Sequence, residues 1–413
     1  MSGLWQEIGL ELGKQEAVGT EEYGDSAPQD HHVCPDCVAD GFLKTLLSQN
    51  LVSRTCNYCG RHADTPIAAP VSVLLDSLAG ALGYSFCDPL SGGVPCNEGD
   101  FVLRPLSTEE ALDEIGFSCS DHLREDVLEA FGDRGWVPAH EEGWLSSSPS
   151  RSWGHAWQRF VHTVKHEVRF FFSTLVVDQD QPEGFVPAEL LATIGRLACE
   201  LGLVRELPVG SRLFRVRNRE DGDNWKLCAE ELGVPPSEKV RARRMNPSGI
   251  GYLYLAHERE TALAEVLGRP PCQAGLGCFE VAFPLRVLDL GRLPEVPSVF
   301  DVDHRLEREV ILFLEEFVAE VCRPVARDRQ EHVDYVPSQV VSEYFAKVFR
   351  TPKGEGVDGI AYPSTVRKGG MNVVLFPPPG GRGGFERLVS FVKAENVDFA
   401  DWRSLFQAIG VVS

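Results

Sequence analysis

The chain has 413 residues, and its 61 acidic side chains outnumber the 40 basic ones, which gives a formal net charge of −21. Such a charge repels a phosphate backbone, so general nucleic-acid binding is not expected. No apolar run reaches the roughly 18–20 residues of a membrane span, and the acidic N-terminus lacks the basic flank of a secretory signal. Twelve cysteines are too few for a disulfide scaffold in so long a chain. We therefore expect a cytoplasmic protein whose clustered cysteines bind metal.

Composition changes along the chain predict five segments. They are a flexible acidic tail at 1–30, a cysteine-containing segment at 31–62, a helical domain at 63–205, a domain of mixed strands and helices at 206–400, and a C-terminal tail at 401–413. Apolar residues at helical spacing begin behind Pro70 and recur to about residue 201.

The segment 206–400 alternates short β-like runs with helical patterns. The predicted strands are RLFRVR, GYLYLA, CFEVAF, RVLDL, GIAYP and NVVLF, and the predicted helices are ETALAEVLG, DHRLEREVILFLEEFVAEVC and PSQVVSEYFAKVF. PPPGGRGGFE reads as a loop. The alternation is too irregular for a doubly wound parallel sheet, so we predict an α+β fold with a mixed sheet, preceded by a mainly helical domain.

Two CxxC pairs stand near the N-terminus, Cys34 with Cys37 and Cys56 with Cys59. Each CxxC turn places two thiolates on one side of a tight loop, and two such turns complete a tetrahedral site for Zn²⁺. Four protein ligands leave no open position for a substrate, so the predicted role is structural. The alternatives are unligated thiols, a redox pair, or a neighbouring histidine in place of one cysteine, and the histidines concerned are His31, His32 and His62.

Arg159 and His166 lie in the expected helix WGHAWQRFVHTVKHEVRFFF. An arginine and a histidine on one helix face could polarise a phosphate and move a proton, and the pattern resembles the ribonuclease signature of HEPN-type domains. A solvated helix face explains the same residues, so a ribonuclease is kept only as an alternative function.

The strongest basic cluster of the chain is KVRARR, which precedes an NPSG loop, the apolar run with Tyr254, and a helical pattern with Glu265. The planar guanidinium of Arg244 suits the pyrophosphate of a ligand, because it makes paired hydrogen bonds to anionic oxygens. Tyr254 offers a flat face for stacking on a ring. A carboxylate among apolar neighbours, such as that of Glu265, is costly unless it has a task. A surface cluster with a core tyrosine and a solvated glutamate is the structural alternative.

These residues occur in blocks that resemble the RES family, over about residues 206–400. RLFRVR is similar to the family's first strand and places Arg215 at its arginine position. RMNPSGIGYLYLAHERETALAEV resembles the central motif, with Arg244, Tyr254 and Glu265 at matching positions. YVPSQVVSEYF resembles the following helix, and GIAYPSTVRKGGMNVVLF the final motif, with Ser364 at the serine position. Arg243 and Met245 depart from the Gly and Trp of many members. The front of the chain is similar to HEPN/RES N-terminal domains.

The resemblance implies a fold like that of ADP-ribosyltransferases, with NAD⁺ as substrate and cleavage of the nicotinamide–ribose bond. It also implies a toxin-like enzyme that transfers the ADP-ribosyl or a related group to water, phosphate or a protein acceptor, with an antitoxin as a further partner to be considered. Arg215 and Arg244 are expected to hold the pyrophosphate and Tyr254 to stack on the nicotinamide or its ribose. Glu265 is expected to stabilise the oxocarbenium-like transition state, and Ser364 to bind a ribose hydroxyl or place the acceptor. A binding module that holds NAD⁺ or ADP-ribose without turnover is the alternative.

Overall fold

The computed structural model describes residues 30–90, 96–97, 100–101, 103–139, 149–172, 187–219, 225–268, 270–324, 331–379 and 381–410. The chain divides into two compact units, one of 1–152 with 295–312 and the other of 153–294 with 313–413. The tail predicted at 1–30 lies, except for its last residue, outside the described residues. The other predicted domain boundaries stay predictions. No helix in the described ranges is long and apolar enough to cross a membrane.

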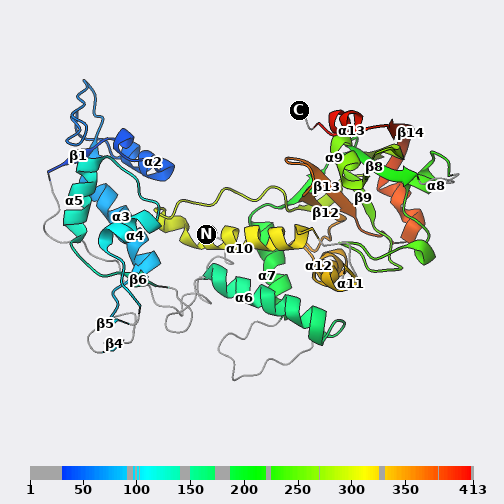
Figure 1. Ribbon diagram of the computed structural model, residues 1–413, viewed down its shortest axis with the longest axis horizontal. Helices are drawn as coiled ribbons and strands as arrows, with labels where there is room; N and C mark the ends of the chain where they lie inside the picture. Colours follow the sequence, from blue (N-terminus) through cyan, green and yellow to red (C-terminus); the bar gives the residue numbers. More distant parts are fainter. Residues whose placement is uncertain are drawn as a thin grey trace. The chain divides into compact units, whose positions relative to one another are not determined.

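Helices dominate the first unit (Figure 1). Its elements are β1 (His32–Val33), η1 (Pro35–Cys37), α2 (Gly41–Gln49), β2 (Ala69–Pro70), α3 (Val71–Ser85), β3 (Phe86–Cys87), β4 (Cys96–Asn97), β5 (Asp100–Phe101), α4 (Thr108–Glu114), α5 (Asp121–Phe131), β6 (Val137–Pro138) and η5 (Val302–His304). The helix predicted behind Pro70 is confirmed as α3, which buries Leu74, Leu75 and Leu78 in the core of this unit. Phe300, from the returning segment 295–312, joins the same core.

The second unit contains a mixed sheet (Figure 1). Its elements, including two helices that begin in residues of the first unit, are α6 (Pro149–His162), η2 (Thr163–Glu167), α7 (Pro187–Glu200), β7 (Val204–Leu207), β8 (Arg212–Arg219), α8 (Ala229–Leu232), η4 (Ser237–Lys239), β9 (Leu253–Ala256), α9 (Arg259–Val266), β10 (Cys272–Val281), β11 (Leu285–Asp289), α10 (Arg305–Cys322), α11 (Glu331–Asp334), α12 (Val336–Lys347), β12 (Gly359–Pro363), β13 (Met371–Leu375), η6 (Gly381–Arg387), β14 (Val389–Phe399) and α13 (Trp402–Ala408).

Eight strands form the sheet in the order β14-β10-β8-β9-β13-β12-β11-β7. Only β11 and β12 pair in parallel, and the other neighbours are antiparallel. This arrangement confirms the predicted α+β class with a mixed sheet. Helices α9 and α13 cover one face near β8 and β9 (Figure 1), where Leu263 and Leu405 pack with Val216.

The register of β9, β13 and β12 places three polar or aromatic side chains on the same face of the sheet. Tyr254 on β9 pairs with Val374 on β13, while Asn372 on β13 pairs with Ala256 on one side and with Tyr362 on the other. Because side chains alternate between the faces of a sheet, Tyr254, Asn372 and Tyr362 share one face. The predicted strands GYLYLA, NVVLF and GIAYP therefore lie side by side in the sheet.

The structure corrects four local expectations. The helix expected through VKHEVRFFF ends as α6 at His162 and continues only as the π-helical turn η2, where Val168 N donates to the carbonyl of Thr163. The expected loop PPPGGRGGFE contains η6. Residues 401–413, expected to be a tail, contain α13. Strands β7 and β14 have no counterpart among the predicted strands, and they are the two edges of the sheet.

Candidate zinc site and candidate active site

The four cysteines of the paired motifs converge in the first unit. Their sulfur atoms all lie within 4.8 Å of one another, and three of the four thiols are buried. Cys34 Sγ lies 3.6 Å from both Cys37 Sγ and Cys59 Sγ, and Cys37 Sγ lies 3.7 Å from Cys56 Sγ. A tetrahedron with Zn–S bonds of about 2.3 Å has edges of about 3.8 Å. The sulfur spacing therefore fits one Zn²⁺.

Two tight turns give the cysteines this geometry. Within η1, the backbone N–H of Cys37 donates to the carbonyl of Cys34 at 3.0 Å. In the second turn, Gly60 N donates to the carbonyl of Cys56 at 3.0 Å, and Gly60 adopts a φ of 69°. That left-handed conformation favours glycine, because a Cβ would be strained there. The backbone N–H of Cys34 also donates to Cys56 Sγ at 3.3 Å, which joins the two turns.

The neighbouring histidines bind other groups. His31 Nδ1 lies 2.9 Å from Asp126 Oδ2, and His62 Nδ1 lies 2.8 Å from Thr55 Oγ1. Among the described residues, the cluster of possible metal ligands consists of the four cysteines, and none of His31, His32 and His62 belongs to it. A site of four thiolates and one Zn²⁺ carries a net negative charge, which a nearby cation stabilises.

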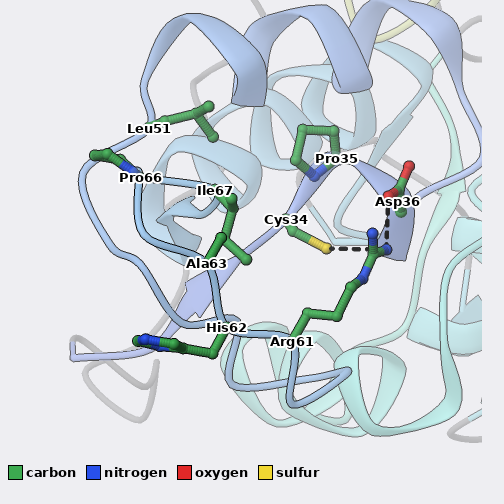
Figure 2. Close-up of a pocket in the computed structure, with 9 residues that line it drawn as sticks. All are labelled: Cys34, Pro35, Asp36, Leu51, Arg61, His62, Ala63, Pro66 and Ile67. Atoms are coloured by element: carbon green, nitrogen blue, oxygen red, sulfur yellow. Dashed lines mark hydrogen bonds and ion pairs between the residues drawn. The ribbon is translucent and has the colours of Figure 1, made fainter.

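Arg61 supplies such a cation, and sequence reasoning missed it. Its Nη2 lies 3.9 Å from Cys34 Sγ and 2.6 Å from Asp36 Oδ2. Burial raises the pKa of the Cys59 thiol, but hydrogen bonds from the backbone and side chain of Arg61 outweigh it and lower that pKa to about 6. Figure 2 shows the Arg61 guanidinium between Cys34 and Asp36.

A pocket of about 350 Å³ lies beside these cysteines (Figure 2). Its lining is mostly apolar and consists of Cys34, Pro35, Asp36, Leu51, Arg61, His62, Ala63, Pro66 and Ile67. None of these residues belongs to the predicted catalytic constellation. The chemistry proposed for the second unit therefore does not depend on this pocket.

Glu265 is the centre of the candidate active site. It lies near the end of α9 and is partly buried. The hydroxyl of Ser364 donates to Glu265 Oε1 at 2.7 Å, and Nδ2 of Asn372 donates to the same oxygen at 2.5 Å. The structure thus joins two of the predicted site residues directly. The buried Tyr362 lies close enough to interact electrostatically, since burial first, then the charges of Tyr254 and Glu265, raise the pKa of Tyr362 well above 10.

Tyr254 holds the basic loop against the sheet. Its hydroxyl donates to Asn246 Oδ1 at 2.8 Å and accepts from the backbone N–H of Met245 at 3.1 Å. The guanidinium of Arg243 lies 5.8 Å from the centre of the Tyr254 ring. Burial raises the pKa of Tyr254, although the hydrogen bond from Met245 and the charge of Arg243 oppose this effect. Tyr254 is therefore a neutral phenol that orders the loop.

Arg244 contacts the end of a neighbouring helix. Its Nη1 donates to the carbonyl of Arg323 at 2.8 Å and to that of Val321 at 3.3 Å, at the C-terminus of α10. The charges of Arg244 and Glu265 both act on the thiol of Cys322. The pKa of this thiol is raised to about 11, mainly by burial; the charge of Arg244 lowers it, and that of Glu265 raises it further. The last carbonyls of a helix favour a cation. The carbonyls at the end of α10 thus orient Arg244. Arg244 and Glu265 both lie close enough to Cys322 to act on its thiol.

Arg215 lies on β8 and donates from Nη1 to the carbonyl of Tyr254 at 3.4 Å. The structure does not bring its guanidinium into a described hydrogen bond with Glu265 or Ser364. Burial, followed by the positive charges of Arg243 and Arg217, lowers the pKa of Arg215 to about 10. Among the described residues, no carboxylate lies within ion-pair distance of Arg215, Arg243 or Arg244. A bound anion would relieve the repulsion between Arg215 and Arg243.

The residues of the ribonuclease alternative lie in the second unit. Arg159 is on α6, whereas His166 is in the π-helical turn η2. The ring of His166 lies 5.3 Å from that of His162 and is tilted against it by 54°. Nδ1 of His162 lies 3.1 Å from Glu167 Oε1. This alternative stays untested.

Sequence reasoning missed two side-chain amides at the candidate active site. Asn246 is 1% exposed and donates to the carbonyls of Arg241, Pro247 and Ile250. Asn372 is 5% exposed in the middle of an apolar strand. The sequence did contain a signal for Asn372, because the amide that begins the apolar run NVVLF is costly to bury without a hydrogen-bond partner. The partner itself could not be found, because Glu265 is distant in the sequence.

Two family models match parts of the chain. The model of the RES domain matches residues 212–389, and that of the HEPN/RES N-terminal domain 1 matches residues 49–176. The RES match includes Arg215, Arg244, Tyr254, Glu265 and Ser364. The HEPN/RES match includes the second cysteine pair and begins after the first. No curated protein matches the chain.

Proposed function

The chain contains a RES domain behind a HEPN/RES N-terminal domain, and from this premise we propose that it is a toxin-like enzyme that cleaves the nicotinamide–ribose bond of NAD⁺. The RES family is associated with NAD and with toxin–antitoxin systems in general. The carboxylate of Glu265 carries the proposal, because two donors hold it in a partly buried position and because the charges of Glu265 and Arg244 both act on the Cys322 thiol.

The proposed step separates charge in a defined way. Nicotinamide leaves with the electron pair of the glycosidic bond, and positive charge develops on the ribose. A fixed, ionised Glu265 stabilises that charge without reorganising. The oxygen of water, of phosphate or of a protein side chain then bonds to the ribose carbon; water or a side chain gives up a proton.

Substrate binding in this proposal depends on the arginine cluster. Arg215, Arg243 and Arg244 present positive charge that no described carboxylate neutralises, which suits the two phosphates of the dinucleotide. Local charge of this kind must overcome the repulsion from a net −21 chain. Tyr254 contributes by ordering the loop on which two of these arginines lie.

The experiment is to incubate the full chain with NAD⁺ and to measure free nicotinamide by chromatography, with and without added phosphate. We expect nicotinamide release. Release without phosphate indicates water or a protein side chain as the acceptor, whereas release only with phosphate, together with a phosphorylated ADP-ribose product, indicates phosphate. Saturable NAD⁺ binding without nicotinamide release would instead support the sensor alternative. If the chain neither binds NAD⁺ nor releases nicotinamide, the proposal is refuted.

The four-cysteine site has a separate structural role in the proposal. Cys34, Cys37, Cys56 and Cys59 would hold one Zn²⁺ and thereby cross-link the two turns of the first unit. A closed thiolate site gives the metal no place for a substrate. An antitoxin and a protein acceptor stay proposed partners, and the cytoplasm the proposed location.

A further inference from the structure

Asn372 is a buried amide with an unusual position. It lies on β13, one of the two central strands of the sheet, and is 5% exposed. Its Nδ2 donates to Glu265 Oε1 across 107 residues of sequence. A buried amide needs its hydrogen bonds, and a bond to a charged acceptor is worth more than one between neutral groups. The pairing of Asn372 with Glu265 therefore satisfies both groups.

The second donor to Glu265 is fully committed. Ser364 has one hydroxyl proton, and it goes to Glu265 Oε1 at 2.7 Å. The same hydroxyl oxygen accepts from the backbone N–H groups of Arg367 at 3.1 Å and Val366 at 3.3 Å. These two backbone contacts fix the orientation of the hydroxyl toward the carboxylate.

Both donors bind the same oxygen of the carboxylate. Among the described contacts of Glu265, the hydrogen bonds from Ser364 and Asn372 fall on Oε1. Two convergent donors fix the torsion of the carboxylate and direct its other oxygen away from them. Oε2 is thereby the oxygen left for a reacting group.

We infer that Asn372 is a positioning residue for Glu265: with Ser364 it anchors Oε1, so that Oε2 faces the charge that develops on the ribose. This inference rests on the proposed function. A carboxylate held by one donor instead of two would sample other orientations. Small errors in the position of a catalytic group cost rate far more than they cost binding.

The kinetic test compares nicotinamide release by the full chain and by Asn372→Ala. We expect kcat to fall on the order of 10-fold to 10²-fold with KM nearly unchanged. Asn372→Asp keeps the size but replaces the donor by a second carboxylate, so its kcat should fall at least as far. Val373→Ala is the matched control, because it truncates a buried side chain of the same strand on the opposite face of the sheet, where Val373 packs in a core cluster with Leu255 and Ala361. It should lower the melting temperature and leave kcat unchanged.

A double-mutant cycle separates positioning from general damage. If Asn372 acts through Glu265, adding Asn372→Ala to Glu265→Gln should change kcat less than about 2-fold. The inference would be overturned if Asn372→Ala lowered kcat equally in the parent protein and in Glu265→Gln, or if it raised KM without changing kcat.

Infrared spectroscopy tests the same contact without activity. Glutamate labelled with ¹³C shifts its carboxylate bands away from those of aspartate, and subtracting the Glu265→Gln spectrum isolates Glu265. We expect Asn372→Ala to move that band, because one donor is lost, and Val373→Ala to leave it in place. If the parent protein releases no nicotinamide, the proposed function fails, but the infrared measurement still shows whether Asn372 positions Glu265. A band that does not move in Asn372→Ala would reject the positioning role.

Discussion

The zinc site and the Glu265 site are built in opposite ways. Each cysteine pair lies within a single turn, and the pairs are close in sequence, so local backbone geometry delivers the sulfurs. Glu265 comes instead from a helix, and its donors Ser364 and Asn372 come from a turn and a strand that lie 99 and 107 residues further along the chain. A local motif thus specifies the first site, whereas the pairing of the sheet specifies the second.

The two sites also differ in how their charges are balanced. At the cysteines, one cation, Arg61, stands beside anionic sulfurs and also pairs with Asp36. At the second site, Arg215, Arg243 and Arg244 lack a described carboxylate partner, and Glu265 is held by neutral donors. A site whose charges are balanced by its own residues is typical of a structural role, whereas a site with unbalanced charge is typical of binding an ionic ligand.

Removal of the metal should produce the largest effect. Zinc bound by four thiolates contributes about 10–16 kcal/mol to the folding of small metal domains. We expect one Zn²⁺ per chain by metal analysis, and its loss together with unfolding of the first unit in Cys56→Ser. Cys119→Ser, a thiol of the same unit outside the cluster, is the control. A folded first unit in freshly purified protein without zinc would contradict the structural assignment.

Replacement of the catalytic charge should have the next largest effect. Glu265→Gln keeps the size of the side chain but removes its negative charge, so kcat should fall on the order of 10² to 10³ with little change in KM. The same variant should relieve growth arrest in bacteria that overproduce the protein. Glu260→Gln, on the same helix, is the matched control. Unchanged nicotinamide release and toxicity in Glu265→Gln would end the catalytic interpretation.

Arg244→Ala tests whether the arginine cluster binds the substrate. Paired contacts between guanidinium and phosphate are worth about 1.5–3 kcal/mol, so KM should rise about tenfold or more, and Arg243→Ala should raise it less. Arg244 also binds the carbonyls of Val321 and Arg323, so its variant alone should lower the melting temperature. If Arg244→Ala lowers stability while KM matches that of the parent, Arg244 supports α10 only.

Tyr254→Phe should have the smallest effect of the four. The variant leaves the N–H of Met245 and Oδ1 of Asn246 without their partner, which costs about 1–3 kcal/mol. Urea unfolding measures this loss. The ring remains, so KM should rise only to the extent that the loop becomes disordered. An unchanged free energy of unfolding would show that the hydroxyl does not order the loop.

Sequence patterns predicted the central strands and missed the edges. RLFRVR, GIAYP and NVVLF correspond to β8, β12 and β13, because strands with neighbours on both sides are rich in apolar residues. At the edges, β14 alternates buried with several exposed polar residues, and β7 has only four residues. Edge strands are often short or charged, which removes the pattern that identifies a strand.

The sequence by itself determined the cysteine set, the α+β class and the segments that carry Glu265 and Ser364, since each depends on spacing or composition within a short stretch. Only the tertiary structure decided that Ser364 and Asn372 bind the same oxygen of Glu265 and that Arg244 binds the end of α10. The physical reason is that strand order and register set which distant side chains meet. Hydrogen bonds across the sheet fix both, and no single segment contains that information.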